Sequence, residues 1–421
     1  MLRLQYVLTG AAVVCVAVIA LLLVHTLGDD EISGPGGNAG SALLASGGNA
    51  FAAAGEEAAR AAVPMASEDA TAGQEKNGNT NGADGENTGA QSKEETFLSS
   101  EELAAEPDVP RIRIVLDPGH GGPGTTDEQE LGAKYRDTFE KYLTLKIAQA
   151  AGQELSTYGN VEVLYTRETD KAMTLKERAA YAKAVDGDCL ISFHLNASEE
   201  HNFFGSEVFT SAFGSYYAWG KGVGDQVLKQ LEADGFVSKG VKTRLGRKGA
   251  DYYGVIRESK EQGIPAIIIE HGYMDQDGDW SRMDTDEKLI QLGKSDAAGI
   301  AAFFGLQKGK NLSELPAADT TEPVSSPVRP DTTDPVNVYY TLTRQDTANA
   351  QITLHAEDPD SRVMYYDYST DAGATWSELY LWPEGIGDDI TFISPVTEAE
   401  EAELRIRAYN TYELRTEAVK K

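Results

Sequence analysis

The chain has 421 residues, of which 41% are hydrophobic, and a formal net charge of -30 at pH 7. This length allows two or three domains, while the acidic balance argues against nucleic acid or anionic lipid as a partner, because phosphate-binding surfaces need clustered Lys and Arg. The two cysteines, Cys15 and Cys189, lie in unrelated sequence contexts and give no disulfide framework.

The first predicted element is the apolar run at residues 7–24, VLTGAAVVCVAVIALLLV, which is about as long as a helix that crosses a bilayer. Arg3 precedes it and acidic residues 29–31 follow, a charge bias that places the N-terminus in the cytoplasm and the rest of the chain outside. A cleaved signal peptide is the competing interpretation, but the run is long for one and no clear small-x-small cleavage site follows closely. We therefore expect a cytoplasmic tip and transmembrane anchor at 1–28, and a secreted protein if this segment is cleaved.

Residues 29–108 are rich in Gly, Ala, Ser, Asn and Glu and contain few large apolar side chains. Such a segment cannot bury enough apolar surface to offset the entropy lost on ordering. It is predicted to be a disordered acidic linker that gives the following domain reach from the membrane.

A folded domain is predicted at 109–308, where strand and helix patterns alternate. Strands are expected over RIRIVLD, VEVLYT, DCLISFHL, SEVFTS and AIIIE, and helices over residues 138–158, LKERAAYAKAV, YYAWGKGVGDQVLKQLEADG and EKLIQLGKSDAAGIAAFFG. This order predicts an α/β fold with a mostly parallel sheet and helices on both faces.

Four residues of this domain carry the chemistry. His120 follows an Asp-Pro-Gly turn, Glu140 lies in the first turn of a predicted helix, and His194 and Glu270 lie near the ends of predicted strands. The carboxyl ends of the strands in such sheets collect functional groups in one crevice. Two imidazoles and one carboxylate form the ligand set of a catalytic zinc that keeps a position open for water. Glu270 stands where a hydrolase would place its general base.

Other titratable residues are given structural interpretations. His25, His201 and His355 are expected to be ordinary surface or structural histidines, and Arg167 and Arg178 to form structural ion pairs or helix contacts.

The motifs of residues 111–306, and their order along the chain, resemble those of the zinc-dependent N-acetylmuramoyl-L-alanine amidases of bacterial cell-wall turnover. The matching motifs are LDPGHGG, EKYLTLKIA, YTRETD with LKERAAYA, SFHLNAS and VIRESKEQGIPAIIIEHGY. The resemblance implies hydrolysis of the amide bond between N-acetylmuramic acid and L-alanine of the peptidoglycan stem peptide. It makes His120, Glu140 and His194 the ligands of Zn2+ and Glu270 the catalytic carboxylate.

Two departures from the family pattern follow Glu270. The family usually reads Gly-Phe-x-Ser-Asn where this chain has Gly-Tyr-Met-Asp-Gln at 272–276, and His271 is unusual. His271 could tune the protonation of Glu270 or simply face the core. The altered loop keeps two alternatives open: a catalytically silent peptidoglycan-binding scaffold, and a zinc peptidase that cuts within the stem peptide.

A second linker, rich in Pro, Thr, Asp and Ser, is predicted at 309–335. Residues 336–421 then show short period-2 strand patterns with turn signals between them, typical of a small β-sandwich. The stretch YYDYSTDAGATWSELY resembles fibronectin type III or immunoglobulin-like modules. Because such folds host many roles, contact with the wall, contact with a protein and plain spacing all stay open. Together the segments predict a single-pass protein of the cell membrane with its catalytic domain outside the cytoplasm.

Overall fold

The computed structural model describes residues 110–124 and 128–421, which all belong to one compact unit. The predicted anchor at 1–28 and the linker at 29–108 lie outside the described residues. Within the described ranges, no helix is both long and apolar enough to cross a membrane.

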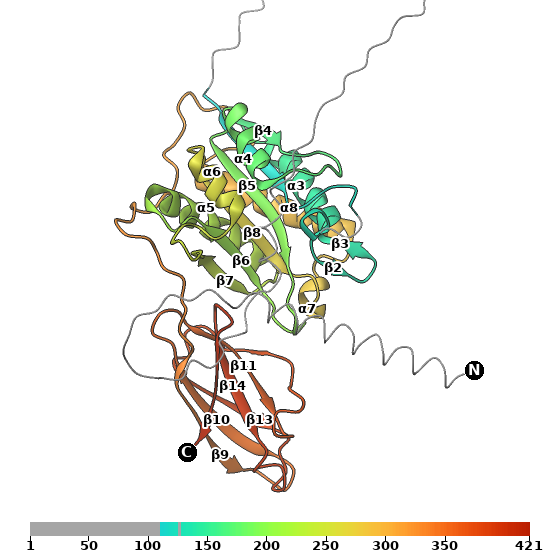
Figure 1. The fold of residues 1–421 in the computed structure, drawn as a ribbon, viewed down its shortest axis with the longest axis vertical. Helices are drawn as coiled ribbons and strands as arrows, with labels where there is room; N and C mark the ends of the chain where they lie inside the picture. The colour runs from blue at the N-terminus through green and yellow to red at the C-terminus, as the bar shows by residue number, and fades with distance from the viewer. Residues whose placement is uncertain (1–109, 125–127) are drawn as a thin grey trace, which may run out of the picture. The chain divides into compact units, whose positions relative to one another are not determined.

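The first part of the fold is a six-stranded sheet with the order β4-β1-β5-β8-β6-β7 (Figure 1). Its strands are β1 (Ile112–Pro118), β4 (Val161–Tyr165), β5 (Cys189–Asn196), β6 (Ser206–Thr210), β7 (Ser238–Lys242) and β8 (Ala266–Tyr273). Strands β4, β1, β5 and β8 are parallel, whereas β6 runs antiparallel to β8 and carries β7 parallel to itself. The mostly parallel sheet is confirmed.

Helices cover both faces of this sheet, as predicted. One face carries α3 (Glu140–Leu155), α5 (Gly214–Ala233) and α8 (Asp286–Phe304), and the other carries α4 (Leu175–Ala184) and α6 (Gly254–Glu261). Shorter elements are α2 (Glu128–Leu131), α7 (Asp277–Trp280) and the hairpin of β2 (Lys134–Tyr135) and β3 (Thr138–Phe139). Helix α4 begins with a capping box in which the Thr174 hydroxyl accepts from the Glu177 amide.

Side chains along β5 alternate between the two faces of the sheet. Cys189, Ile191 and Phe193 are fully buried in the core beneath α3, α5 and α8. Each such Ile or Phe contributes about 1.5–3 kcal/mol through burial. The intervening residues point to the opposite face. His194 is one of them.

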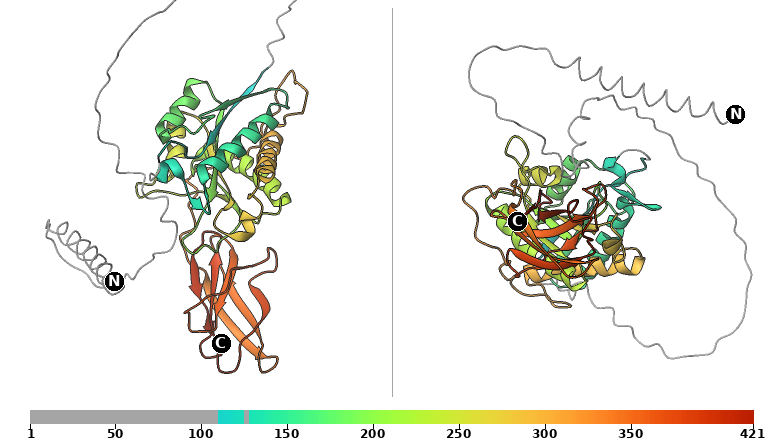
Figure 2. Two further views of the ribbon diagram at one scale, coloured as in Figure 1. Left: turned by 90° about the vertical axis from the view of Figure 1, so that its right-hand side faces the viewer. Right: turned by 90° about the horizontal axis from the view of Figure 1, so that it is seen from below.

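The C-terminal part consists of two four-stranded sheets, ordered β13-β10-β9-β16 and β12-β11-β14-β15, shown in orange to red in Figure 2. The strands are β9 (Val336–Arg344), β10 (Ala350–Glu357), β11 (Val363–Ser369), β12 (Tyr380–Leu381), β13 (Asp389–Ser394), β14 (Arg405–Asn410), β15 (Arg415–Glu417) and β16 (Val419–Lys420). Both sheets contribute to one core that contains Ile352, Leu354, Tyr366 and Ile406. The expected pair of sheets is present.

Residues 311–335 contain no helix or strand but are hydrogen-bonded to the α/β domain. The Asp319 amide donates to the Phe303 carbonyl at 3.0 Å, and the Val328 amide donates to the Ala212 carbonyl at 2.9 Å. The segment predicted as a linker therefore runs along the surface of the domain.

Candidate metal and catalytic site

Three functional side chains lie in one row across neighbouring strands. His194 of β5 is paired in register with Glu270 of β8, which is paired in turn with Glu207 of β6. All three project from the face of the sheet that carries α4 and α6. His194 and Glu270 lie near the C-terminal ends of their strands, as the sequence predicted.

Glu140, the first residue of α3, joins the two histidines. Its Oε2 lies 3.1 Å from His120 Nε2, and its Oε1 lies 3.0 Å from His194 Nδ1. The same oxygens accept hydrogen bonds from the amides of Ala133, at 2.9 Å, and Leu195, at 3.0 Å. One ligand atom from each of His120, Glu140 and His194 can be chosen so that all lie within 4.8 Å of one another. The structure thus brings together the three predicted ligands.

The electrostatics of this group fit metal binding. Burial alone would raise the pKa of Glu140, but the charges and hydrogen bonds of His120 and His194 lower it well below its usual value. Burial lowers the pKa of His194. Both shifts favour a charged carboxylate beside a neutral imidazole, which is the form of histidine that ligates metals.

Two glycines create the space for these side chains. A Cβ at Gly119 would lie 2.4 Å from Cε1 of His194, and a Cβ at Gly132 would lie 2.5 Å from Oε2 of Glu140. Gly132 also has a φ of +68°, a conformation that glycine adopts at no steric cost. Larger residues at either position would displace the side chains of His194 and Glu140.

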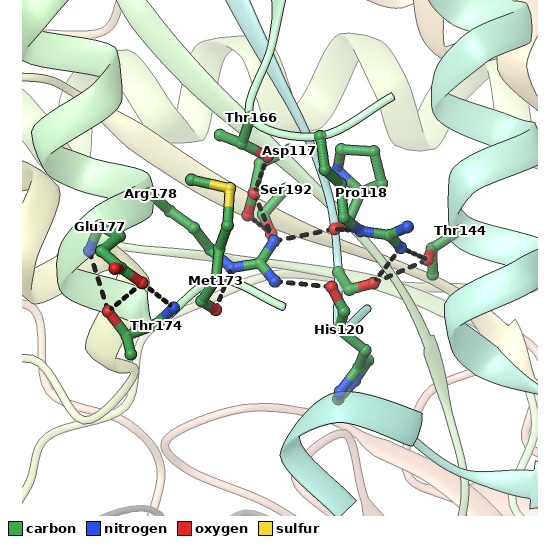
Figure 3. Close-up of polar contacts among 12 residues, drawn as sticks. Asp117, Pro118, His120, Thr144, Thr166, Met173, Thr174, Glu177, Arg178 and Ser192 are labelled. Atoms are coloured by element: carbon green, nitrogen blue, oxygen red, sulfur yellow. Dashed lines mark hydrogen bonds and ion pairs between the residues drawn. The ribbon is translucent and has the colours of Figure 1, made fainter. Parts of the chain in front are cut away.

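A buried ionic network holds the loop that carries His120 (Figure 3). Asp117 accepts from Thr166 Oγ1 at 2.5 Å, from Arg178 at 2.6 Å and from Ser192 Oγ at 2.7 Å. Arg178 also donates to the carbonyl of His120 at 2.6 Å, and Arg167 donates to that of Gly119 at 2.7 Å. The structural roles expected for the two arginines are confirmed.

Glu270, the fourth predicted residue, is the strand neighbour of His194. Its Oε2 is buried and has no hydrogen-bond partner among the described residues. Burial first, and then the charges of Glu140 and Glu207, raise its pKa well above the usual value, while Lys239 acts in the opposite direction.

Sequence reasoning missed the charged residues next to Glu270. Glu207 is buried and accepts from Asn196 Nδ2 at 2.7 Å and from Lys242 Nζ. Lys239 and Lys242 are buried on β7, a five-residue strand whose sequence, SKGVK, is typical of a surface loop. The signal that could have identified them is weak, because their acidic partners are distant in the sequence.

The altered loop after Glu270 makes its own hydrogen bonds. Asp275 accepts from the Ser198 amide at 2.9 Å and lies 2.7 Å from His201 Nδ1, while Gln276 Oε1 caps α7. His271 points away from Glu270 into the core: its Nδ1 donates to the His194 carbonyl at 2.9 Å, and its Nε2 lies 2.8 Å from Asp296 of α8. Of the two roles considered for His271, facing the core is the observed one.

His201 and His355, which the sequence predicted to be ordinary surface or structural residues, lie away from this site. His201 is exposed and pairs with Asp275, and His355 pairs with Glu357 and Asp389 in the C-terminal sheets. Neither belongs to the one group of potential metal ligands found within the described ranges. His25 lies outside those ranges.

The chain can now be placed among known proteins. Residues 114–302 match the family model described as N-acetylmuramoyl-L-alanine amidase. The endolysin of Bacillus phage SPP1 is 30% identical over 197 residues, which cover 46% of this chain and 67% of the endolysin. The chain belongs to the N-acetylmuramoyl-L-alanine amidase family.

One further relative carries the name of this family. The N-acetylmuramoyl-L-alanine amidase CwlM of Bacillus licheniformis is 29% identical over 203 residues, or 47% of this chain and 70% of CwlM. Among solved structures, Cwp6 from Clostridium difficile shares 31% sequence identity, with a TM-score of 0.41, over 46% of this chain and 29% of Cwp6. The protein is therefore an amidase that hydrolyses peptidoglycan, and residues 114–302 carry this activity.

Proposed function

We propose that the amidase works as a zinc enzyme in which His120, Glu140 and His194 hold Zn2+ and Glu270 is the general base and acid. The carrying observation is the convergence of the three donor groups beside a carboxylate whose Oε2 has no hydrogen-bond partner within the described part of the chain. The substrate bond is the amide between N-acetylmuramic acid and L-alanine of the stem peptide.

The donor set fits zinc in chemistry and spacing. Histidine nitrogens and carboxylate oxygens are ligands of catalytic zinc sites, and one such atom from each of His120, Glu140 and His194 lies within 4.8 Å of the other two. Three protein ligands leave the fourth position open, as in catalytic sites. Zinc here would polarise the amide carbonyl and lower the pKa of a water ligand toward neutrality.

The protein's own groups move the proton. Oε2 of Glu270 accepts the proton as the oxygen of the attacking water forms a C–O bond to the carbonyl carbon, and it delivers the proton to the leaving amine of L-alanine as the C–N bond breaks. The raised pKa of Glu270 suits this role, because a strongly acidic carboxyl would not hold the proton between the two steps. Glu140, with its lowered pKa, stays ionised throughout.

We also propose that the catalytic domain acts outside the cytoplasm, held at the cell membrane by the segment at 1–28. The apolar run at 7–24 and the charges on either side of it support this proposal. Peptidoglycan is then within reach of the domain through the acidic segment 29–108.

The decisive experiment incubates the purified full-length chain with peptidoglycan and identifies the released peptides. We expect stem peptides that begin with free L-alanine. His194→Ala should lose both bound zinc and activity, whereas Glu270→Gln should keep its zinc and lose about 10³-fold in kcat, within the usual contribution of a general base. Glu232→Gln, on the exposed surface of α5, is the matched control and should behave as wild type.

Other outcomes would favour the alternatives. A folded protein that binds peptidoglycan without metal-dependent release would be a silent scaffold. New amino termini inside the stem peptide would identify a zinc peptidase.

A further inference from the structure

Two buried lysines lie close to the proposed catalytic carboxylate without taking part in the chemistry. The side chain of Lys239 is 0% exposed and that of Lys242 is 4% exposed. A buried ammonium group is strongly destabilising unless it is paired and hydrogen-bonded. The partners of these lysines therefore decide whether β7 can form beside β6.

Half of those partners come from the C-terminal sheets. Lys242 Nζ donates to Glu207 and to the carbonyl of Thr411, and Lys239 Nζ donates to Tyr273 Oη at 2.7 Å and to Glu413. Thr411 and Glu413 belong to residues 411–414, the turn that joins β14 to β15. We call this segment the β14–β15 turn.

Glu413 is also the partner of Tyr273, whose hydroxyl donates to the same carboxylate. Burial alone would lower the pKa of Lys239, but the charges of Glu207 and Glu413 raise it. Lys239 is therefore positively charged, and its charge is stabilised by Glu207 of the α/β domain and by Glu413 of the C-terminal part.

Apolar packing closes this contact against water. One cluster combines residues from both parts: Phe203, Tyr273, Met364, Tyr365, Leu379 and Tyr409. All six are buried, and Tyr365 donates its hydroxyl to the carbonyl of Phe204. The rings of Phe203 and Tyr409 meet edge to face with centroids 5.7 Å apart. The lysines and Glu413 thus sit in a region of low dielectric, where their charges act strongly.

Tyr273 contributes more than an aromatic ring to this contact. A phenylalanine would supply the ring but not the hydroxyl that bridges Lys239 and Glu413. The tyrosine is matched to the β14–β15 turn.

We propose that the β14–β15 turn is a working part of the amidase: Glu413 fixes Lys239, the Thr411 carbonyl fixes Lys242 on the same strand, and Lys242 holds Glu207 beside Glu270. The C-terminal sheets then support the active site from within the same chain. Glu413, Lys239 and Tyr273 are positioning residues, because their role is to place the groups next to Glu270 and not to move the proton. The inference rests on the proposed catalytic role of Glu270.

The path from the turn to the site is short. Lys242 holds Oε2 of Glu207, while Asn196 holds Oε1 at 2.7 Å. Glu207 is the backbone partner of Glu270 in the sheet, and its charge is one of those that act on Glu270. If Glu413 no longer engages Lys239, this lysine loses its ion-pair partner and keeps its hydrogen bond to Tyr273. The arrangement beside Glu270 then changes.

The test compares Glu413→Gln and Tyr273→Phe with Glu417→Gln in the full-length protein. Glu417 lies on neighbouring β15, where its side chain is half exposed and pairs with Arg405 across the surface, so its variant is a matched control. For both test variants we expect kcat to fall about tenfold, with KM within about twofold and zinc content unchanged, since small misplacements of catalytic groups cost this much or more. The control should match wild type in all three quantities.

A double variant separates positioning from mere stability. Replacing both partners of a buried ion pair with apolar residues often restores stability. Lys239→Met combined with Glu413→Met should therefore recover the melting temperature lost by Glu413→Gln, while kcat stays low. Recovery of kcat together with stability would reduce the pair to a structural role and overturn the proposal.

The outcomes also distinguish this proposal from the proposed function. If Glu270→Gln keeps its activity, the role of Glu270 fails whatever the Glu413 variant shows. If Glu270→Gln is inactive and Glu413→Gln has wild-type kcat, only the role of the β14–β15 turn fails.

Discussion

At the scale of single residues, His120 has a constrained backbone. Its φ of 59° is left-handed, which costs a non-glycine residue about 1–3 kcal/mol unless its surroundings enforce it. Arg178 enforces it through the His120 carbonyl, and Arg178 is itself fixed by Asp117 (Figure 3). The orientation of the proposed ligand therefore depends on a buried ion pair that contacts no substrate.

Asp117→Asn tests this dependence. Loss of the charge leaves Arg178 buried without its counterion, and breaking such a pair costs about 3 kcal/mol. We expect that decrease in the free energy of unfolding at pH 7, measured by denaturant titration, together with weaker zinc binding. Asp225→Asn, in an exposed pair with Lys221, should cost less than about 0.5 kcal/mol.

The pH dependence of the same variant has a definite sign. Burial would raise the pKa of Asp117, but Arg178 and the hydrogen bonds of Thr166 and Ser192 lower it below 3.8. The stabilisation is therefore complete above about pH 3.8 and is lost as the pH falls through the lower folded-state pKa. The gap between wild type and Asp117→Asn should stay constant from pH 7 to about pH 4 and narrow only in stronger acid. A gap that closes near pH 6 would assign the stabilisation to another group.

The proposed ligands and the proposed base could be predicted from sequence because each stands in a motif with a chemical reason for its residue type. His120, Glu140 and His194 are indeed brought together. Glu207, Lys239 and Lys242 could not be predicted in this way. Their burial depends on one another and on Thr411, which is 169 residues from Lys242. Charged residues in short polar segments are usually on the surface.

At the scale of secondary-structure elements, strand β8 separates two functions on its two faces. Glu270 points to the face that carries α4 and α6. His271 points to the opposite face, where its ring is hydrogen-bonded to Asp296 of α8. Since His271 Nδ1 donates to the His194 carbonyl, this contact ties α8 and β8 to the strand that carries a proposed ligand. Phe193 stacks on the His271 ring with centroids 6.0 Å apart.

Asp296→Asn should reveal the charge of this contact. Burial alone lowers the pKa of His271, but Asp296 raises it above 6.5; burial raises the pKa of Asp296 as well, and the charge of His271 opposes that rise. The stabilisation is present below about pH 6.5 and is lost as the pH rises through the raised folded-state pKa. The amide that replaces the carboxylate in this variant can still donate to a neutral His271. We expect a loss of about 2 kcal/mol at pH 6.

The measurement is denaturant unfolding of both proteins from pH 6 to pH 9. The difference between them should shrink as the pH rises. Parallel stability curves over this range would show that His271 is already neutral at pH 6.

The elements that sequence periodicity predicted well are the long ones with a clear apolar pattern, such as β1, β5, α3 and α8. Strand β7 and helix α6 were missed, because five and eight largely polar residues give too short a pattern. The antiparallel direction of β6 could not be predicted, since alternation is the same in either direction. In the C-terminal part, β15 and β16 have only three and two residues, which is too short for an alternating pattern to be recognised.

At the scale of the whole molecule, the important difference concerns the two segments predicted as linkers. Both segments are polar, yet residues 311–335 are hydrogen-bonded to the α/β domain. The amides of Asp319 and Val328 donate to Phe303 and Ala212. The carbonyl of Val328 also accepts from the Thr243 hydroxyl at 2.8 Å. Thr243 directly follows β7, so this segment and the β14–β15 turn engage the same edge of the sheet. The composition of a segment indicates whether it can form its own core, but not whether it binds to a neighbouring one.

Limited proteolysis with a glutamate-specific protease tests this difference. The predicted linker at 29–108 contains many glutamates, and Glu322 lies exposed in the second segment. A protease needs several residues of backbone to open locally, which the hydrogen bonds at Asp319 and Val328 oppose. We expect cleavage within 29–108 at least about tenfold faster than at Glu322, leaving a stable fragment that contains both the α/β domain and the C-terminal sheets. Equally fast cleavage at Glu322 would return residues 309–335 to the role of a free linker. Slow cleavage at Glu322 would mean that the C-terminal sheets are attached to the α/β domain twice, by residues 311–335 and by the β14–β15 turn. The first attachment keeps the turn near β7, so that the contact between Glu413 and Lys239 costs little additional chain entropy.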